Sequence, residues 1–280
     1  MTGVRLLGLT VLAMLAFAGN SLLCRLALKA TTIDPATFTS IRIVTGAAML
    51  WLIVRVRSGA SPRAGSWCGA LMLVAYAIAF SFAYVHLGAA TGALLLFAAV
   101  QATMIGYGWW RGERLQGRRL GGFALALAGL GSLVLPGLSA PPIAGAALMI
   151  GAGIAWGVYS LLGRNGGDPS SVTAGNFARA IVPALVVSAL FASSITLDGR
   201  GMLYAGLSGA ITSGLGYAIW YAVLPSLSVS AAAVAQLSVP IIAAAGGVAL
   251  LDEPLTLRLV AASILTLGGI ALVVLPQGSR

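Results

Sequence analysis

The chain has 280 residues, of which 59% are hydrophobic and 8% are charged, and its mean hydropathy is +1.01. A soluble globular domain carries about 25% charged residues, so this composition excludes an ordinary soluble protein. The net charge of +10 would indicate a nucleic-acid partner in a soluble protein, but basic residues of a membrane protein mark the side of the bilayer that they flank. We therefore expect a polytopic membrane protein whose partner is the lipid bilayer, with no nucleic acid.

Apolar segments long enough to cross a bilayer recur along the whole chain. A helix needs about 20 apolar residues to span roughly 30 Å of hydrocarbon, and short breaks of charged residues, Gly and Pro separate ten such segments. The predicted spans are residues 6–28, 36–56, 67–86, 88–110, 119–135, 142–163, 172–193, 201–224, 227–251 and 255–275. The fold class is therefore all-α, a membrane protein with ten transmembrane helices.

The basic residues are divided unequally between the two faces of the membrane. If the spans alternate, ten of them share the face of the N-terminus: Arg5, Arg55, Arg57, Arg63, Arg111, Arg114, Arg118, Arg119, Arg164 and Arg280. Four lie opposite: Arg25, Lys29, Arg200 and Arg258. The positive-inside rule then predicts cytoplasmic N- and C-termini. The expected location is the bacterial inner (plasma) membrane.

The end of the chain repeats the end of its first half. The segment from Glu113 to Pro136 aligns with the segment from Glu253 to Pro276 at an offset of about 140 residues, and such self-similarity indicates a duplicated unit. The alignment matches Arg118 with Arg258 and Gly129 with Gly269. We expect a first five-helix repeat at residues 1–137 and a second at residues 138–280.

Five spans per unit is an odd number, so the second copy must enter the membrane from the opposite face. Inverted repeats related by a pseudo-two-fold axis are common in secondary transporters, whose substrate site lies near the midplane where the repeats meet. The sequence therefore predicts two inverted five-helix repeats with a central cavity between them.

These features resemble the EamA-type branch of the drug/metabolite transporter superfamily. The resemblance covers essentially the whole chain and rests on the ten spans and on a closing segment, found twice, with Glu, a basic residue and a Gly-rich helix ending in Leu-Pro. It implies a monomeric or homodimeric secondary transporter, not an enzyme, that works by alternating access. The similarity to aromatic amino-acid exporters of the YddG type implies export of a small-molecule substrate, namely amino acids with aromatic or apolar side chains. Export of drugs or other metabolites is the alternative.

Polar and aromatic residues at membrane depth are the candidates for substrate binding, because unpaired polar groups are costly there and usually serve a purpose. The candidates are Phe17, Asn20, Tyr76, Gln101, Trp156, Tyr159, Tyr217, Trp220 and Gln236. The repeat matches Phe17 with Trp156, which would bring two aromatic rings to corresponding places in a pocket. The alternative is that these side chains only pack or form hydrogen bonds between helices.

Three further residues are candidates for gating or hinge roles. Arg42 and Arg179 lie about two turns inside their spans, where an arginine can snorkel to the headgroups, pair with an acidic residue in a gate, or meet a substrate carboxylate. Pro240 interrupts the ninth span one turn after Gln236 and could serve as a hinge or as a passive kink. None of the six acidic residues falls inside a predicted span, so no proton-relay carboxylate is evident.

Two rival classes are less favoured by the sequence. Gly206-Leu207-Ser208-Gly209 has the form of an intramembrane serine protease motif, but such a site needs a base nearby and the only histidine, His86, ends the third span. A channel would need repeated polar rings along one path, whereas the polar residues gather near mid-depth. The sequence has no metal-ligand cluster and no phosphate-binding loop, so we expect no cofactor and no metal.

Overall fold

The computed structural model describes residues 3–58, 64–112, 117–135, 140–163, 168–227 and 229–275. Several residues of the sequence argument lie outside these ranges, namely Arg63, Glu113, Arg114, Pro136, Arg164, Pro276 and Arg280. Within the described ranges the chain is helical, with no strand. The prediction of an all-α membrane fold is confirmed.

The helices follow the predicted spans closely. They are α1 (Gly3–Ala30), α2 (Pro35–Ser58), α3 (Trp67–His86), α4 (Ala89–Trp110), α5 (Arg118–Val134), α6 (Ile143–Leu162), α7 (Pro169–Leu190), α8 (Gly199–Leu207), α9 (Gly216–Val223), α10 (Val229–Leu251) and α11 (Leu257–Val274). Of the described chain, nine helical segments have at least 18 residues and are apolar enough to cross a membrane, with Gly199–Ser226 counted as one. The tenth crossing is α5, which has 17 residues.

The eighth predicted span is not a uniform α-helix. Between α8 and α9 the chain forms a π-helical segment, η3 (Ser208–Leu215), and α9 is followed by the short turn η4 (Leu224–Ser226). A second short turn, η2 (Ala192–Ser194), joins α7 to α8. The residues 208–215 therefore carry one extra residue per turn in a helix that was expected to be regular.

Several helices begin at a polar capping residue, which accepts a hydrogen bond from the otherwise unpaired first turn. The Asp34 side chain accepts from the Thr37 backbone N–H at 2.8 Å, and the Asp168 side chain accepts from the Ser171 N–H at 2.9 Å. Asp34 directly precedes Pro35, the first residue of α2, and Asp168 directly precedes Pro169, the first residue of α7. Proline suits this position because the first helical N–H has no partner inside the helix.

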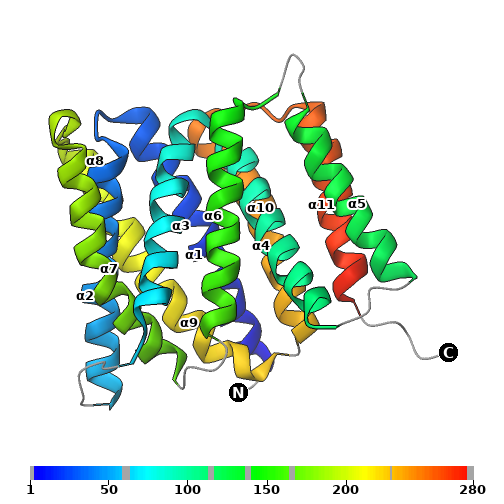
Figure 1. Cartoon of the computed structure of the whole chain (residues 1–280), viewed down its shortest axis with the longest axis horizontal. Helices are drawn as coiled ribbons and strands as arrows, with labels where there is room; N and C mark the ends of the chain where they lie inside the picture. Colours follow the sequence, from blue (N-terminus) through cyan, green and yellow to red (C-terminus); the bar gives the residue numbers. More distant parts are fainter. Residues whose placement is uncertain are drawn as a thin grey trace.

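The helices contact one another in pairs that correspond across the predicted repeat. Matched helices lie against each other, as α2 lies against α7, α4 against α10 and α5 against α11. The contact of α3 with α6 likewise corresponds to the contacts of α1 with α8, η3 and α9. The start of α1 and the end of α11 lie at the same end of the bundle (Figure 1). This arrangement agrees with two inverted units, although the division at residue 137 stays a prediction.

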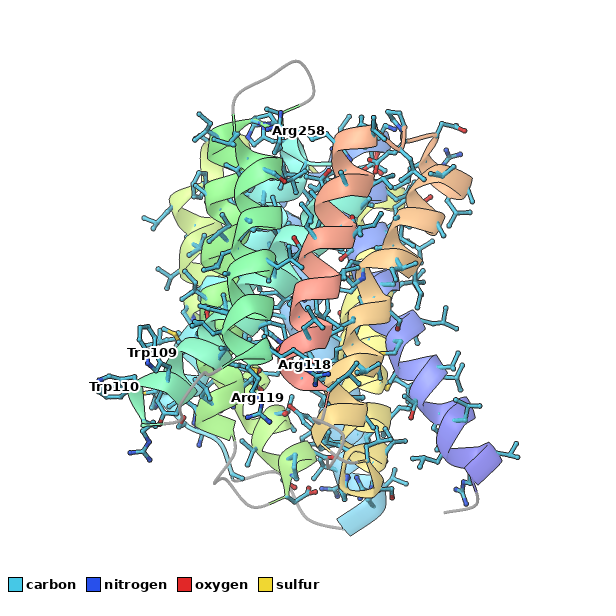
Figure 2. All side chains as sticks on the ribbon, turned by 90° about the vertical axis from the view of Figure 1, so that its right-hand side faces the viewer. Trp109, Trp110, Arg118, Arg119 and Arg258 are labelled. Carbon is cyan, nitrogen blue, oxygen red and sulfur yellow. The ribbon has the colours of Figure 1, made fainter. Side chains whose placement is uncertain are left out.

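The pair α5 and α11 runs antiparallel, with the N-terminus of each helix at the C-terminus of the other. Figure 2 shows Arg118 and Arg258 at opposite ends of this pair. The Arg118 guanidinium donates to the Leu275 carbonyl, and the Arg258 Nε donates to the Ser132 carbonyl at 2.9 Å. Each matched arginine therefore caps the partner helix, where a positive charge is favourable beside the last carbonyls.

Candidate functional site

A cavity of about 510 Å³ lies in the middle of the bundle. Its wall is formed by side chains from α1, α3, α4, α6, α7, η3, α9 and α10. All nine residues predicted for substrate binding line it: Phe17, Asn20, Tyr76, Gln101, Trp156, Tyr159, Tyr217, Trp220 and Gln236. The structure thus brings them together around one space, and their role in binding stays a prediction.

Aromatic rings from four helices pack in one group around this cavity, with Trp156 at its centre. The Trp156 ring stacks on Tyr217 with 5.2 Å between centroids and 20° between planes, and it lies 4.7 Å from Tyr76 and 5.3 Å from Tyr159. Phe17 lies 5.6 Å from Tyr217. The matched pair Phe17 and Trp156 therefore contacts the same tyrosine, so the wall offers broad apolar faces for an uncharged ligand group.

A hydrogen-bonded network around Asn20 forms a polar part of the wall. The Asn20 Nδ2 donates to the Tyr76 hydroxyl at 3.2 Å, and the Asn20 Oδ1 accepts from the Ser208 hydroxyl at 2.7 Å and from Thr212 at 3.5 Å. The network joins α1 to α3 and to the π-helical segment. Because an asparagine side chain buried at membrane depth needs such partners, Asn20 is held in one orientation beside the cavity.

Two glutamines line the cavity on the side of α4 and α10. Gln101 is buried and makes no side-chain hydrogen bond to another described residue, and Gln236 is partly buried. A buried amide can make up to four hydrogen bonds. The Gln101 amide therefore keeps its donors and acceptor available toward the cavity.

Arg42 is buried among residues of the cavity wall without itself lining the cavity. Its side chain is 1% exposed, so the expectation that it snorkels to the headgroups is wrong. The guanidinium donates to the Tyr76 hydroxyl at 2.9 Å and to the Ser213 hydroxyl at 3.3 Å. It also lies over the Phe80 ring, 4.9 Å from the centroid. Among the described residues it contacts no carboxylate.

The matched arginine, Arg179, lies at a different kind of place. It is partly buried, and its Nη1 donates to the Ala64 carbonyl at 2.8 Å and to the Gly175 carbonyl at 3.0 Å. Arg179 thus ties α7 to the loop before α3, away from the cavity. No acidic partner of either arginine is found in the described part of the chain, where the single ion pair involves other residues.

The hinge expectation concerns α10. Pro240 lies inside α10, which continues through it, and Gln236 one turn earlier lines the cavity. The π-helical segment was not foreseen, and it contributes Thr212 and Ser213 to the cavity wall. π-Helical turns occur frequently at functional sites. The nearest signal in the sequence is a run of small residues, with Gly206, Gly209, Gly214 and Gly216 in succession.

The protease interpretation finds no support in this geometry. Ser208 is completely buried, and its hydroxyl donates to Asn20. His86 lines a separate, smaller cavity of about 300 Å³ at the other end of the bundle. In the described part of the chain no histidine therefore accompanies this serine, and its hydroxyl belongs to the hydrogen-bonded network around Asn20.

The central cavity extends toward one end of the bundle and is separated from the other. Ser160, Gly163 and Pro169 extend the lining to the place where α6 ends and α7 begins, and Pro169 is exposed. At the opposite end, Arg25 Nε donates to Glu253 Oε1 at 2.8 Å. The other oxygen of Glu253 accepts from the Ala89 N–H at 2.6 Å, at the start of α4. This carboxylate therefore joins α1 and α4 to the connection between α10 and α11.

Comparisons with known proteins agree with this architecture. Residues 143–275 match the model of the EamA-like transporter family. An uncharacterized protein of Pseudomonas aeruginosa is 56% identical over 277 residues, which cover 99% of this chain and 96% of that protein. An uncharacterized transporter of Archaeoglobus fulgidus is 27% identical over 284 residues, covering 96% and 97% of the two chains. A solved crystal structure with a TM-score of 0.67 and 19% identity covers 95% of this chain and 97% of its own, and shares the fold.

Proposed function

Because the chain belongs to the EamA-like transporter family, and so is a membrane transporter of the drug/metabolite transporter superfamily, we propose that it is a secondary transporter that exports small organic solutes. The solutes that we propose are amino acids with aromatic or apolar side chains. Other metabolites or drugs of similar size are the alternative cargo. The proposal places the protein in the bacterial inner membrane with both termini in the cytoplasm.

The observation that carries this proposal is the aromatic cavity in the middle of the bundle. Its volume of about 510 Å³ falls within the range of roughly 300–1,000 Å³ that is usual for small-molecule sites. Its wall combines the rings around Trp156 with the polar groups of Asn20 and Gln101. A solute with an apolar body and charged ends needs both kinds of surface, because its charges must keep hydrogen-bond partners while its side chain gains from burial.

The closure of one end supports alternating access as the mechanism. The Arg25–Glu253 ion pair lies at the end of the bundle opposite to the end toward which the cavity extends. Moving one inverted unit against the other would open this end and close the one near Pro169, as proposed in general for carriers built from inverted repeats. The two-repeat division at residues 137 and 138 is part of this proposal.

The deciding experiment is transport by the purified protein in sealed proteoliposomes. Counterflow of radiolabelled amino acids should be fastest for phenylalanine, tryptophan, leucine and similar side chains, and slow for serine and aspartate. Liposomes without the protein serve as the control. Equal rates for all amino acids, or no flux of any of them above the control, would reject the amino-acid proposal. Flux of other organic solutes alone would then favour the alternative cargo.

A further inference from the structure

Arg42 carries a full positive charge in the interior of the bundle, and none of the described residues supplies a counter-ion to it. Its side chain is 1% exposed, and it lies in α2 between α3 and the π-helical segment η3. A charged group inside a membrane protein is costly unless it is paired, and in such positions it usually belongs to a substrate or ion pathway. The guanidinium cannot relieve this cost by losing its proton, because arginine stays protonated in proteins.

Among the described residues, the hydrogen-bond partners of Arg42 are all neutral, and one of its three nitrogen atoms has no partner. Nη2 donates to the Tyr76 hydroxyl, Nε donates to Ser213, and Nη1 is buried with no hydrogen-bond partner. The rings of Tyr76 and Phe80 lie 5.1 and 4.9 Å from the guanidinium carbon. Aromatic faces attract a cation, but they do not neutralise its charge. The hydrogen bonding around Arg42 is therefore incomplete in this conformation.

The residues around Arg42 bring its charge to the cavity. Tyr76, Phe80 and Ser213 all line the cavity, whereas Arg42 lies behind them. The Tyr76 hydroxyl accepts hydrogen bonds from both Arg42 and Asn20, so its two lone pairs are occupied. Its own proton has no acceptor among the described residues. The wall thus presents a hydroxyl donor that is polarised by a cation directly behind it, which strengthens the donor toward an anion.

Among the residues that the structure describes, no acidic side chain lines this cavity. In the described part of the chain the single ion pair, Arg25–Glu253, belongs to the smaller cavity at the other end. We propose that the missing counter-ion is supplied by the cargo: the transported solute carries a carboxylate that Tyr76 and Ser213 bind, with Arg42 behind them providing the charge. This inference rests on the proposed transport function and defines its substrate class as organic carboxylates with an apolar or aromatic body.

The test compares each carboxylate with its uncharged or amidated analogue in binding to the detergent-purified protein. Suitable pairs are 3-phenylpropionate with 3-phenylpropionamide, benzoate with benzamide, and phenylalanine with phenylalaninamide. Dissociation constants are measured by isothermal titration calorimetry at pH 7, where a carboxyl group of pKa about 4 is ionised. We expect the carboxylate to bind roughly tenfold more tightly than the amide, because hydrogen bonds to charged groups are stronger than neutral ones.

Three variants separate the role of the charge from a structural role. In Arg42→Gln the preference for the carboxylate should fall close to one, whereas Arg42→Lys, which keeps the charge, should retain most of it. If neither variant folds, Tyr76→Phe preserves the ring and should reduce the preference severalfold. Arg179→Gln is the matched control. It removes the corresponding arginine outside the cavity, so the carboxylate-to-amide ratio should equal that of the unmodified protein.

The outcomes distinguish this inference from the proposed function. If no pair favours the carboxylate, or if the preference survives both Arg42→Gln and Tyr76→Phe, the inference is overturned even when the protein transports amino acids. Conversely, a carboxylate preference that disappears in these variants supports the inference even when transport of amino acids is absent in proteoliposomes. In that case only the proposed cargo fails.

Discussion

At the scale of single residues, Trp156 holds the aromatic wall together. Its indole contacts the rings of Tyr76 in α3, of Tyr217 in α9 and of Tyr159 in its own helix, α6. Aromatic pairs of this kind contribute about 0.5–1.5 kcal/mol each beyond the burial of their area. A tryptophan in this position therefore both stabilises the packing of the tyrosines and offers a face to a ligand. The two roles can be separated by measuring how the effect of a Trp156 substitution on the transport rate depends on the side chain of the substrate.

The first prediction is that Trp156→Ala weakens transport of large apolar and aromatic solutes about three- to tenfold, the equivalent of one lost aromatic contact. Small solutes should lose less. The measurement is the initial rate per correctly inserted molecule across a series of side chains. Trp110→Ala is the control, because Trp110 is 80% exposed at the end of α4 and points away from the bundle (Figure 2).

Equal losses for every substrate, or none, would indicate that Trp156 only packs.

For Asn20→Ala and Gln101→Ala the expected pattern is the opposite, because these amides would serve the backbone charges that all amino-acid substrates share. Their loss should weaken every such substrate to a similar extent. A loss restricted to aromatic substrates would contradict that assignment.

Arg42 and Arg179 show what a sequence can and cannot predict about a site. Both lie at the same depth within matched spans, and depth alone favoured snorkelling for both. The outcome differs because the rotational position of α2 directs Arg42 toward α3 and η3, whereas Arg179 reaches a loop carbonyl at Ala64. Depth can be counted along the chain, but the neighbours on each face of a helix depend on how the other helices pack.

At the scale of elements, the π-helical segment η3 can pack closely against α2 because Gly209 has no side chain at the contact. A Cβ atom at Gly209 would overlap the Thr45 hydroxyl and the Arg42 carbonyl, whereas a Cβ at Gly206 would meet nothing within 4 Å. The backbone of η3 therefore approaches α2 more closely than any side chain allows. In this arrangement Ser213 of η3 lies beside the Arg42 guanidinium and lines the cavity, so the irregular helix contributes directly to the polar wall.

The second prediction follows from these two glycines. Gly209→Ala should lower the free energy of unfolding of the detergent-purified protein by about 1–3 kcal/mol, which is the usual cost of overpacking a well-packed interior. Gly206→Ala should be neutral or stabilising by up to about 1 kcal/mol, because alanine favours the helix. Differential scanning fluorimetry compares the melting temperatures of the two variants with that of the unmodified protein. Equal stability of both variants would show that η3 can move away from α2 without cost.

The spans themselves were predictable because the bilayer requires about 20 apolar residues for each crossing. All ten crossings have counterparts in the structure, and the candidate residues Asn20, Gln101 and Trp156 line the same cavity. The π-helical segment was not predictable in the same way. Hydropathy measures the length of an apolar segment, and an extra residue within one turn leaves that length nearly unchanged.

At the scale of the whole molecule, the orientation in the membrane is the third prediction. Cys68 at the start of α3 is exposed and should face the cytoplasm, whereas Ser194 in η2 is exposed at the other face and should lie outside. In intact cells a membrane-impermeant maleimide should label Ser194→Cys in a Cys68→Ser background. It should label native Cys68 only after permeabilisation. The reverse pattern would contradict cytoplasmic termini.

The fourth prediction concerns energy coupling. No acidic residue of the described ranges lines the central cavity, and His86 lies in the smaller cavity at the far end. We therefore expect transport that does not need a proton gradient. Collapsing the pH gradient across proteoliposomes at constant membrane potential should leave the flux unchanged. A loss of flux that is reproduced by His86→Ala would instead identify His86 as part of a proton pathway.

The uncompensated charge of Arg42 also determines how voltage acts on the transport cycle. With a monoanion bound, the charges in the cavity sum to zero, whereas the empty carrier keeps its positive charge. A potential of 100 mV changes the energy of one elementary charge that crosses the whole field by about 2.3 kcal/mol. A negative cytoplasm would thus draw the empty carrier back to its inward-facing state and leave the loaded step unaffected.

The fifth prediction is therefore that voltage sets the direction of net flux. A potassium diffusion potential imposed with valinomycin, negative on the cytoplasmic side, should accelerate net export of a monoanionic solute severalfold. Exchange of solute for solute needs no empty return and should not respond. In Arg42→Gln the empty carrier is neutral and the loaded one negative, so voltage should act on the loaded step and exchange of solute for solute should become sensitive to voltage. A negative cytoplasm should still favour net export in this variant, because the charge moved in each cycle is that of the cargo. In the unmodified carrier, by contrast, the membrane potential would drive export through the return of the empty, positively charged binding site.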